Sequence, residues 1–499
     1  MSISFQQIHP INIDAAWSMQ PFNGFCLDSR KLEAGQIFIA LNSFSQAEKT
    51  RQFAQNALDA GALVVISETA LGLEKEWTCP TVRQLLGEWQ KQYLQHIDPI
   101  SILRGIAVTG TNGKTTISRL IAELVSSQGQ GCAVMGTTGN GILPNLTPSS
   151  HTTLDALQLQ NALHAYAKQG AAFVALEASS HGLEQGRLNG CEIEIAVYSN
   201  LSRDHLDYHG TLEAYAEAKA LLFRFTTLKA VVINLDDAYA ALMLDAAKAN
   251  PSQPKILTYS LTQASADYHI ADLHYQLSGA RFTLIAPSGL YSVQSPLLGH
   301  FNVENLLASL IAAEYAGFAL ADLVQFVPQL QGAPGRMQVI QDAERLFVVD
   351  YAHTPDALIQ VLTTLKRHVS GQLWAVFGCG GDRDRGKRPL MTQAALDHAN
   401  PVVLTSDNPR TENPEQIFAD MKQNIDFADH TTHEIHDRRE AIRFVVEHAQ
   451  AGDIVVIAGK GHENYQEVDG VRHWFDDVVE VQSAITAQPH SIHSAYPAQ

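Results

Sequence analysis

Alternating apolar and polar stretches divide the chain into three blocks of predicted strands and helices. In the first block, residues 1–98, two short apolar strands, GQIFIAL and ALVVISE, flank a helical stretch that begins at Thr50. The second block, residues 99–332, has longer apolar runs with helical segments between them: GIAVTG, AAFVAL, EIAVYSN and AVVINLDD. Continuous apolar runs of this kind are typical of strands buried on both faces, so we expect a parallel sheet here.

In the third block, residues 333–499, apolar strands run into polar loops rich in Gly or Pro, usually followed by helical patterns. The stretches are RLFVVDYAHTP, QLWAVFGCGGDRDRGKRP, PVVLTSDNPRTENP and DIVVIAGKGHE. This βαβ rhythm predicts an α/β protein with a second, doubly wound parallel sheet. Ligands bind such sheets at the carboxyl ends of the strands, which is where these polar loops are expected.

The stretch TGTNGKTT, residues 109–116, follows a predicted strand and precedes a predicted helix. It is shorter than the usual phosphate-loop pattern G-x-x-x-x-G-K-[ST], because Val108 stands where the first glycine belongs and Gly110 comes two places later. Apolar residues then recur at helical spacing from Ile117 to Val125, which predicts one helix face. This context favours a nucleotide site over a chance Gly-Lys-Thr in a turn.

The predicted loop has the groups that a nucleoside triphosphate needs. The amino end of the following helix offers N–H groups and a favourable dipole to phosphate. Lys114 would reach the β- and γ-phosphates, and the hydroxyl of Thr115 would bind Mg²⁺. Asn112 tolerates the left-handed backbone that a tight loop can require.

Three other positions have both a functional and an ordinary interpretation. Glu177 ends a strand where an acidic metal ligand is expected, although such a residue is often merely solvated. His205 lies in the polar stretch NLSRDHLDYHG, which could equally be a surface turn. Lys219 shares a helix face with Tyr215 and Leu222; its side chain either extends to water or turns inward, where a neutral amine could be carbamylated.

Composition and charge narrow the class of protein. The 499 residues include 34 Lys and Arg against 52 Asp and Glu, a formal charge of −18, which disfavours nucleic acid as a partner. Five scattered cysteines without a C-x-x-C pair argue against a zinc ribbon or a disulfide framework and favour the cytoplasm. The sequence has no long apolar run typical of a membrane span and no secretory signal at its start.

Several motifs together resemble the Mur ligases, the ATP-dependent amide-bond ligases of peptidoglycan synthesis. They are GTNGKTT, EASSHG, NLSRDHLDYHG, YAEAK, GHFNVENLLAS, PGRM and GKGHE, and the resemblance covers nearly the whole chain. It implies three domains: a small N-terminal α/β domain that binds a uridine nucleotide, a central ATP-binding parallel sheet of P-loop type, and a C-terminal Rossmann-like domain that binds the incoming amino acid. The implied limits are 1–98, 99–332 and 333–499.

The resemblance assigns roles to residues by motif. The implied ATP contacts are Gly110, Thr111, Asn112, Gly113, Lys114, Thr115, Thr116, Asn302, Asn305, Arg336, Asp350 and His353. Mg²⁺ would be held by Thr115, Glu177, His205 and carbamylated Lys219. Lys114, Lys219, His205 and Glu177 are the implied catalytic residues.

The first block also resembles the domain that binds the UDP-linked muramoyl dipeptide. The implied contacts are Leu27, Ser29, Ser45, Gln46, Ala47, His151, Thr152, Thr153, Ser179, Gln185 and Arg187. Two of them depart from the family pattern: Ser45 stands where His is expected, and His151 where Asn is frequent.

The stretch DNPR is similar to the signature of family members that add meso-diaminopimelate. The implied amino-acid contacts are Arg383, Asp407, Asn408, Pro409, Arg410, Gly459 and Glu463. A guanidinium matches the far carboxylate of this amino acid in a two-pronged manner, which lysine as acceptor could not satisfy. Three alternatives stay open: a sibling ligase that adds lysine, a folate polyglutamate ligase, and a nucleotide-binding regulator without turnover. We expect a monomer with small-molecule partners.

Overall fold

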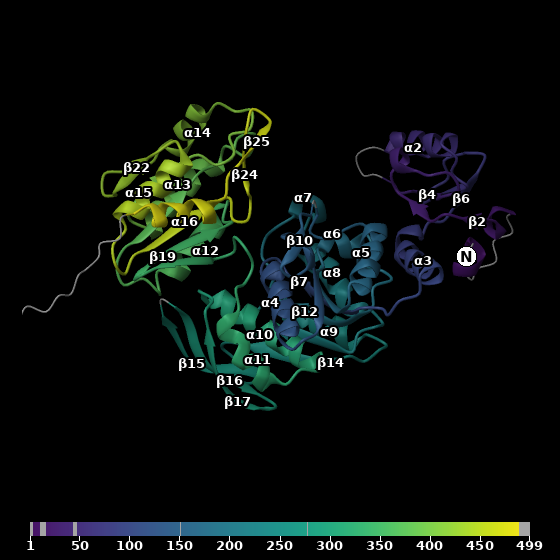
Figure 1. Ribbon diagram of the computed structural model, residues 1–499, viewed down its shortest axis with the longest axis horizontal. Helices are drawn as coiled ribbons and strands as arrows, with labels where there is room; N and C mark the ends of the chain where they lie inside the picture. Colours follow the sequence, from purple (N-terminus) through teal and green to yellow (C-terminus); the bar gives the residue numbers. More distant parts are fainter. Residues whose placement is uncertain (1–2, 10–15, 43–46, 150, 277, 489–499) are drawn as a thin grey trace, which may run out of the picture. The chain divides into compact units, whose positions relative to one another are not determined.

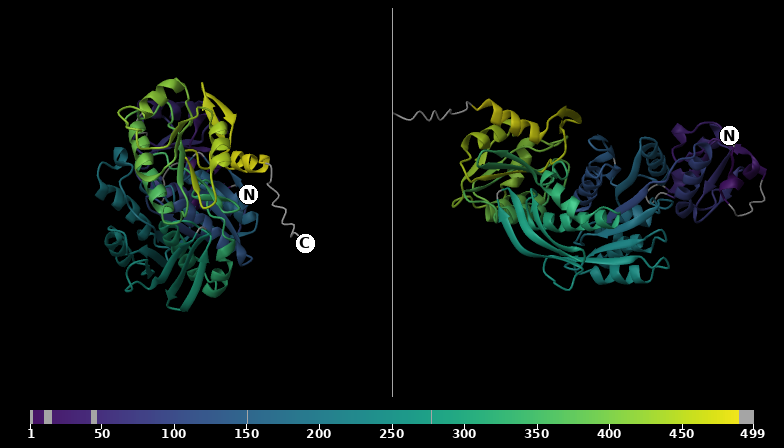
Figure 2. Two further views of the ribbon diagram at one scale, coloured as in Figure 1. Left: turned by 90° about the vertical axis from the view of Figure 1, so that its left-hand side faces the viewer. Right: turned by 60° about the horizontal axis from the view of Figure 1, so that its bottom comes forward.

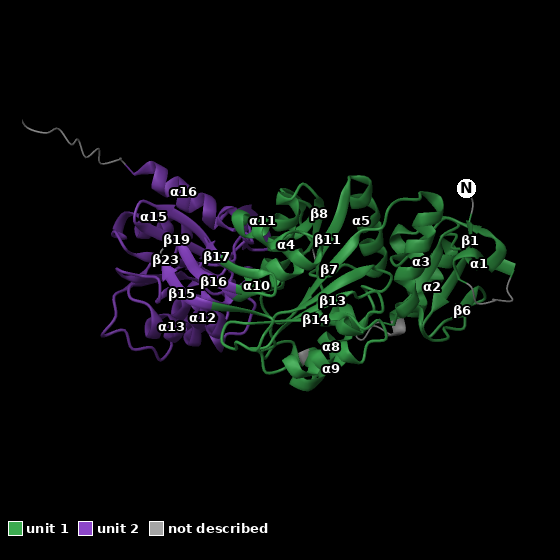
Figure 3. Cartoon of the chain, turned by 90° about the horizontal axis from the view of Figure 1, so that it is seen from below, with its two compact units in different colours: residues 1–270, 285–291, 304–326 green, residues 271–284, 292–303, 327–499 purple. Residues whose placement is uncertain are grey.

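The computed structural model describes residues 3–9, 16–42, 47–149, 151–276 and 278–488. Contacts divide the chain into two compact units, coloured in Figure 3. Unit 1 comprises residues 1–270, 285–291 and 304–326, and unit 2 comprises 271–284, 292–303 and 327–499. No helix of the described residues is long and apolar enough to cross a bilayer.

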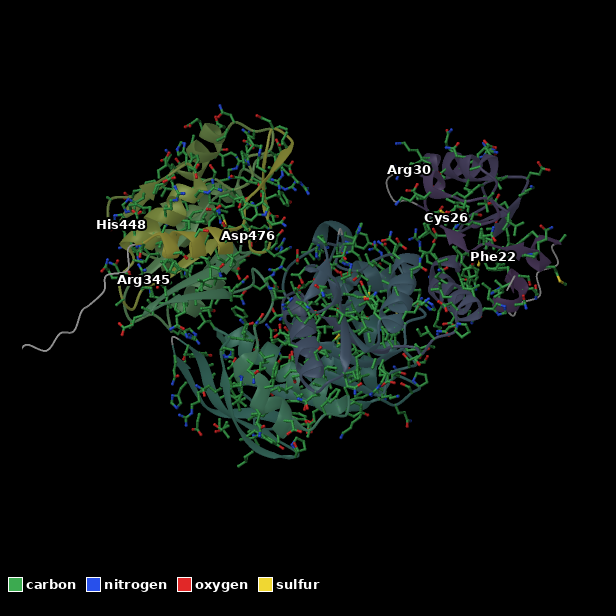
Figure 4. All side chains as sticks on the ribbon, viewed as in Figure 1. Phe22, Cys26, Arg30, Arg345, His448 and Asp476 are labelled. Atoms are coloured by element: carbon green, nitrogen blue, oxygen red, sulfur yellow. The ribbon has the colours of Figure 1, made fainter. Side chains whose placement is uncertain are left out.

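The first block of unit 1 is a small parallel sheet covered by helices. Its strand order is β3-β4-β5-β6, and all three pairings are parallel. The elements are β1 (Ile3–Ser4), α1 (Phe5–Ile8), β2 (Pro21–Phe22), β3 (Phe25–Cys26), β4 (Ile37–Ala40), α2 (Ala47–Asp59), β5 (Val64–Ser67), β6 (Glu76–Thr78) and α3 (Val82–Ile97). Phe22 and Cys26, labelled in Figure 4, belong to separate apolar clusters of this block.

The central block of unit 1 contains the predicted parallel sheet, in the order β8-β11-β7-β12-β13-β14. Strands β7, β12 and β14 are labelled in Figure 1. These strands are β7 (Arg104–Thr109), β8 (Gly131–Gly136), β11 (Ala171–Glu177), β12 (Ile193–Tyr198), β13 (Ala230–Asn234) and β14 (Lys255–Ser260). The antiparallel strands β9 (Gly139–Ile142) and β10 (Asn145–Thr147) extend the edge beside β8. Since β7 lies in the middle, the loop after it opens at the carboxyl edge between β11 and β12.

The central block also has helices, some of which pack against this sheet. They are α4 (Lys114–Ser127), α5 (Ala156–Lys168), α6 (Ser180–Glu184), α7 (Leu206–His209), α8 (Leu212–Ala220), α9 (Ala240–Lys248), α10 (His300–Tyr315) and α11 (Leu320–Phe326). Strands β15 (Tyr268–Gln276), β16 (Gly279–Ala286) and β17 (Gly289–Ser295) have residues in both units. The apolar face predicted from Ile117 to Val125 is buried, as its periodicity requires.

Unit 2 contains the second doubly wound sheet, in the order β18-β19-β23-β20-β21-β22. Its strands are β18 (Gln338–Asp342), β19 (Arg345–Asp350), β20 (Leu373–Phe377), β21 (Val402–Leu404), β22 (Thr432–Glu434) and β23 (Ile454–Ala458). Among the described residues of this sheet, β18 pairs antiparallel with β19, and the other neighbouring strands pair parallel. Leu346 and Val348 pack on one face, and Phe347 and Val349 on the other.

Helices therefore cover both faces of this sheet, as Figure 2 shows. They are α12 (Pro355–Leu365), α13 (Lys387–His398), α14 (Pro414–Met421), α15 (Arg438–His448) and α16 (Asp477–Ala487), with a hairpin of β24 (Tyr465–Val468) and β25 (Val471–Trp474). The prediction of an α/β chain with parallel sheets in the second and third blocks is confirmed, and the first block has a small parallel sheet as well. The exact domain limits at 98 and 332 stay predictions.

Candidate functional site

The glycine loop joins β7 to α4 with a turn that only glycine adopts easily. Gly113 immediately precedes the helix with φ of +87°, in the left-handed region. A Cβ at this position would collide with the side-chain oxygen of Asn305 in α10. The predicted nucleotide contact Asn305 therefore lies directly against the loop, although it is almost two hundred residues away in sequence.

Two residues after β12 hold the loop in shape. The backbone N–H of Asn112 donates to Oδ1 of Asn200 (3.0 Å), and the hydroxyl of Ser199 donates to the carbonyl of Asn112 (2.6 Å). The N–H of Thr111 donates to the carbonyl of Asn200 (2.8 Å). These bonds pre-form the loop. Neither residue was predicted as a contact, although Asn200 begins the motif NLSRDHLDYHG, because the motif does not indicate which of its polar residues meets the loop.

Two lysines converge on one carbonyl oxygen of the loop. Nζ of Lys114 lies 2.8 Å from the carbonyl oxygen of Gly110, and Nζ of Lys219 lies 2.8 Å from the same oxygen. Lys219 is 1% exposed, so its side chain turns inward rather than to water. Burial, followed by the positive charge of Lys114, holds the pKa of Lys219 well below its ordinary value, which favours the neutral amine.

Glu177 ends β11 and is buried against the turn after β8. Its Oε1 accepts from the N–H of Thr137 (2.8 Å), and its Oε2 accepts from the Thr137 hydroxyl (3.2 Å). Thr152 contacts the same hydroxyl (3.1 Å), and the hydroxyl of Thr153 donates to the backbone carbonyl of Glu177 (2.7 Å). The predicted metal ligand is therefore adjacent to two predicted substrate contacts.

His205 lies before α7 with φ of +52°, and its side chain is 49% exposed. Its ring meets that of His181 edge-on at 5.1 Å between centroids. The ring centre of Tyr215 lies 6.0 Å from the ring centre of His205 and 4.2 Å from Nζ of Lys219. Within the described residues, no three His, Cys, Asp or Glu side chains form a preassembled metal cluster; the predicted ligand set draws instead on a threonine and a modified lysine.

A cavity of about 240 Å³ lies within unit 1, between the first and central blocks. Four predicted UDP-substrate residues line it, together with five that were not predicted: Leu27, His151, Gln185 and Arg187, with Leu41, Arg83, Leu86, Asp155 and Ala156. Two arginines line it together with Asp155, and Arg83 is paired with Glu68; guanidinium groups are well suited to bind phosphate oxygens. Arg83 lies in an amphipathic helix, where an arginine is normally solvated, so sequence alone could not single it out.

The other predicted substrate contacts connect to this cavity through hydrogen bonds. Arg187 donates to the carbonyl of Thr153 (2.9 Å), and Ser179 donates to the Thr153 hydroxyl (3.0 Å). Ser29 begins a 3₁₀ helix two residues after Leu27. Ser45 and Gln46 lie outside the described residues, and of the next residue, 47, only the backbone is described, as the first position of α2.

The predicted amino-acid contacts of unit 2 gather at the carboxyl ends of β20, β21 and β23. Arg410 has φ of +53° and donates to the carbonyl of Gly381 (2.8 Å). Nδ2 of Asn408 donates to Oε2 of Glu463 (2.9 Å). A Cβ on Gly459 would lie 2.6 Å from Oδ2 of Asp407. The side chain of Arg383 lies near Gly380, so Arg383 belongs to the same group. Pro409 belongs to it because it lies between Asn408 and Arg410 in the sequence.

Three of the predicted ATP positions of unit 2 lie around Tyr351. The Arg336 guanidinium lies 4.8 Å from the centre of its ring, and Nδ1 of His353 lies 2.9 Å from its carbonyl oxygen. Asp350 accepts from the N–H groups of Met337 and Ala352, both at 2.8 Å, and burial raises its pKa.

Asn302 lies near the start of α10, in the part of that helix assigned to unit 2. It is buried, and its Nδ2 donates to the carbonyl oxygen of Leu298 (2.8 Å). Asn305, the other predicted ATP contact of α10, lies one turn further along the same helix.

Comparisons with known proteins show the family of this chain. Residues 108–313 match the Mur ligase middle domain, and residues 335–461 match the Mur ligase, glutamate ligase domain. A UDP-N-acetylmuramoyl-L-alanyl-D-glutamate–2,6-diaminopimelate ligase of Ectopseudomonas mendocina (strain ymp) is 42% identical over 483 residues, which cover 96% of this chain and 98% of that protein.

Solved structures show the same relationship. One of a UDP-N-acetylmuramoyl-L-alanyl-D-glutamate–2,6-diaminopimelate ligase is 78% identical, covers 98% of this chain and 99% of its own, and has a TM-score of 0.81. A MurF ligase of Thermotoga maritima in complex with ADP shares the fold at 16% identity, with a TM-score of 0.55 and coverage of 92% and 96%. With family models matching both the central and C-terminal blocks, and a relative 42% identical over nearly its full length, the chain belongs to the Mur ligase family.

Proposed function

We propose that this protein uses ATP to join meso-diaminopimelate to UDP-N-acetylmuramoyl-L-alanyl-D-glutamate, in cytoplasmic synthesis of peptidoglycan precursors. The proposal depends on the predicted amino-acid contacts of unit 2, called the acceptor group below: Arg383, Asp407, Asn408, Pro409, Arg410, Gly459 and Glu463. The chain that contains them is 78% identical to a UDP-N-acetylmuramoyl-L-alanyl-D-glutamate–2,6-diaminopimelate ligase. There Arg410 is anchored on the carbonyl of Gly381, and Glu463 is held by Asn408. A guanidinium and a carboxylate so placed suit the carboxylate and ammonium at the far end of this amino acid.

The residues around the glycine loop fit a bound Mg²⁺. Glu177 offers a carboxylate, Thr115 a hydroxyl at the start of α4, and His205 an imidazole. The neutral amine favoured at Lys219 can attack CO₂, forming an N–C bond and losing one proton, which leaves an anionic carbamate. That anion would also balance the charge of Lys114, which meets the same carbonyl oxygen. When bound, Mg²⁺ would neutralise phosphate charge and orient the γ-phosphate.

The chain's own groups then bring two anions together. The loop N–H groups, the amino end of α4 and Lys114 bind the phosphates, while Arg187 and its neighbours bind the UDP-linked dipeptide. An oxygen of the D-glutamyl carboxylate attacks the γ-phosphorus, the bond to ADP breaks, and an acyl phosphate forms. Lys114 offsets the repulsion between carboxylate and triphosphate during this step.

The second step forms the amide. Arg410 and Glu463 would hold the distant end of meso-diaminopimelate, which leaves its other amine as the nucleophile. The amine nitrogen attacks the carbonyl carbon, a tetrahedral intermediate forms, and inorganic phosphate leaves as the amine proton is lost. Each turnover releases one ADP and one phosphate. We expect the protein to act as a monomer.

An acceptor panel tests the proposal. Phosphate release is measured with Mg-ATP, the UDP-linked dipeptide and one acceptor at a time: meso-diaminopimelate, its LL and DD stereoisomers, or L-lysine. We expect release with meso-diaminopimelate to exceed release with lysine by at least a hundredfold, since lysine lacks the far carboxylate. Equal rates with lysine would indicate the sibling ligase. Release that needs a folate acceptor, or no acceptor-dependent release, would contradict the proposal.

A further inference from the structure

Lys460, in the loop after β23, is a fully buried lysine beside the acceptor group. It is 0% exposed, and its Nζ lies 3.1 Å from Oδ1 of Asn408 and 3.3 Å from Oε2 of Glu463. The ring centre of Tyr465 lies 5.4 Å from Nζ. Removing an ammonium group from water is unfavourable unless its hydrogen-bond partners are well placed. Both hydrogen-bond partners of Lys460 are predicted to contact the incoming amino acid, which points to a role for Lys460 in that site.

The contacts of Lys460 set the orientation of the Asn408 amide. Oδ1 of Asn408 accepts from Nζ of Lys460 and from the N–H of Glu467 (2.9 Å), so its NH₂ group must face the other way. That NH₂ group donates to Oε2 of Glu463 (2.9 Å). Without Lys460 the amide would lose a donor that fixes its orientation.

The same contacts occupy one oxygen of Glu463 and leave the other for a ligand. Oε2 accepts from both Lys460 and Asn408. Among the described residues, Oε1 accepts no hydrogen bond, and the side chain of Glu463 keeps 19% of its surface exposed. The carboxylate is thus held by one oxygen while the second can receive an ammonium group.

We propose that Lys460 is a positioning residue for acceptor selection: it orients Asn408 and holds Glu463 by Oε2, so that Oε1 meets the far ammonium of the amino-acid substrate. This inference rests on the proposed function and extends it to a residue outside the predicted site. An apolar side chain of similar length would fill the same space without fixing either neighbour.

The test compares Lys460→Met with the parent enzyme and with a matched control. Lys422→Met removes a lysine of the same domain whose Nζ pairs with Glu434 at the surface. We expect Lys460→Met to raise KM for meso-diaminopimelate at least twentyfold, with KM for Mg-ATP and for the UDP-linked dipeptide within twofold of the parent. Lys422→Met should leave all three unchanged. A rise of all three KM values together would overturn the proposal.

A double-variant cycle checks that Lys460 acts through its neighbour. If it does, Lys460→Met combined with Glu463→Gln should raise the acceptor KM little more than Glu463→Gln alone, whereas independent effects would multiply. Should Lys460→Met not fold, Lys460→Gln bears the test, with the same KM pattern expected. Failure of both to fold would also overturn the proposal, because it would place Lys460 in the domain core.

Assays of the parent enzyme distinguish a failure of this proposal from a failure of the proposed function. If the parent does not respond to meso-diaminopimelate, the proposed function fails. If the parent responds and Lys460→Met keeps its acceptor KM, only the role of Lys460 fails.

Discussion

Glu304, between the two predicted nucleotide contacts of α10, should make the protein less stable as pH rises. Burial, together with the negative charges of Asp236 and Asp237, raises its pKa from 4.5 to about 7. Each tenfold change in proton affinity corresponds to about 1.4 kcal/mol, so ionised Glu304 costs the folded state about 3 kcal/mol.

The sign follows from which state holds the proton more tightly. The folded state keeps the Glu304 proton up to about pH 7, whereas the unfolded chain releases it near pH 4.5. The contribution to stability is therefore present below pH 4.5, falls as pH rises towards 7, and stays lost above it. Glu304→Gln cannot ionise, so the variant should exceed the parent in stability by about 2 kcal/mol at pH 6 and about 3 kcal/mol at pH 8.

Urea unfolding of the parent and the variant at pH 6, 7 and 8 measures this difference. All three pH values lie above the pI of about 5.5, where solubility is lowest. The difference between the two proteins is the useful quantity, because histidines titrate over the same range in both. Glu74→Gln, at an exposed glutamate of the same unit, should show no pH-dependent difference. A Glu304→Gln difference that does not change with pH, or a variant less stable than the parent at pH 8, would refute the reasoning.

Three further predictions concern the site. Lys219→Ala should lower kcat at least a hundredfold, and short carboxylic acids should restore part of it by replacing the carbamate; normal turnover without them would remove the metal role. Arg410→Ala should raise the acceptor KM by about tenfold to about 150-fold, since hydrogen bonds to charged groups contribute about 1.5–3 kcal/mol, while the ATP KM stays within twofold in steady-state assays. Gly87→Ala places a Cβ against the carbonyl oxygen of Asn189, so α3 must shift at the edge of the cavity. We expect about 1–3 kcal/mol lower stability in thermal unfolding and a higher KM for the UDP-linked dipeptide, and parental values of both would exclude this close contact.

The apolar patterns of the sequence determined the two parallel sheets and the glycine loop. The helical spacing of the apolar residues from Ile117 to Val125 and the apolar strand before Gly110 are local features of the sequence. Because they depend only on nearby residues, the predicted helix and strand are present in the fold. The family motifs likewise predicted which residues contact each substrate, and these assignments stay predictions. What such motifs could not indicate is how the side chains meet.

The tertiary structure decided the environment of each charged residue. From sequence, Lys219 could extend to water or turn inward; it is buried because α8 packs near the glycine loop, where the carbonyl of Gly110 accepts from its amine. Arg83 shares a cavity with Arg187, and Lys460 is enclosed between Asn408 and Glu463. Periodicity follows from residues a few positions apart, but the burial and pairing of a charge depend on segments tens to hundreds of residues away, which only the packed chain brings together.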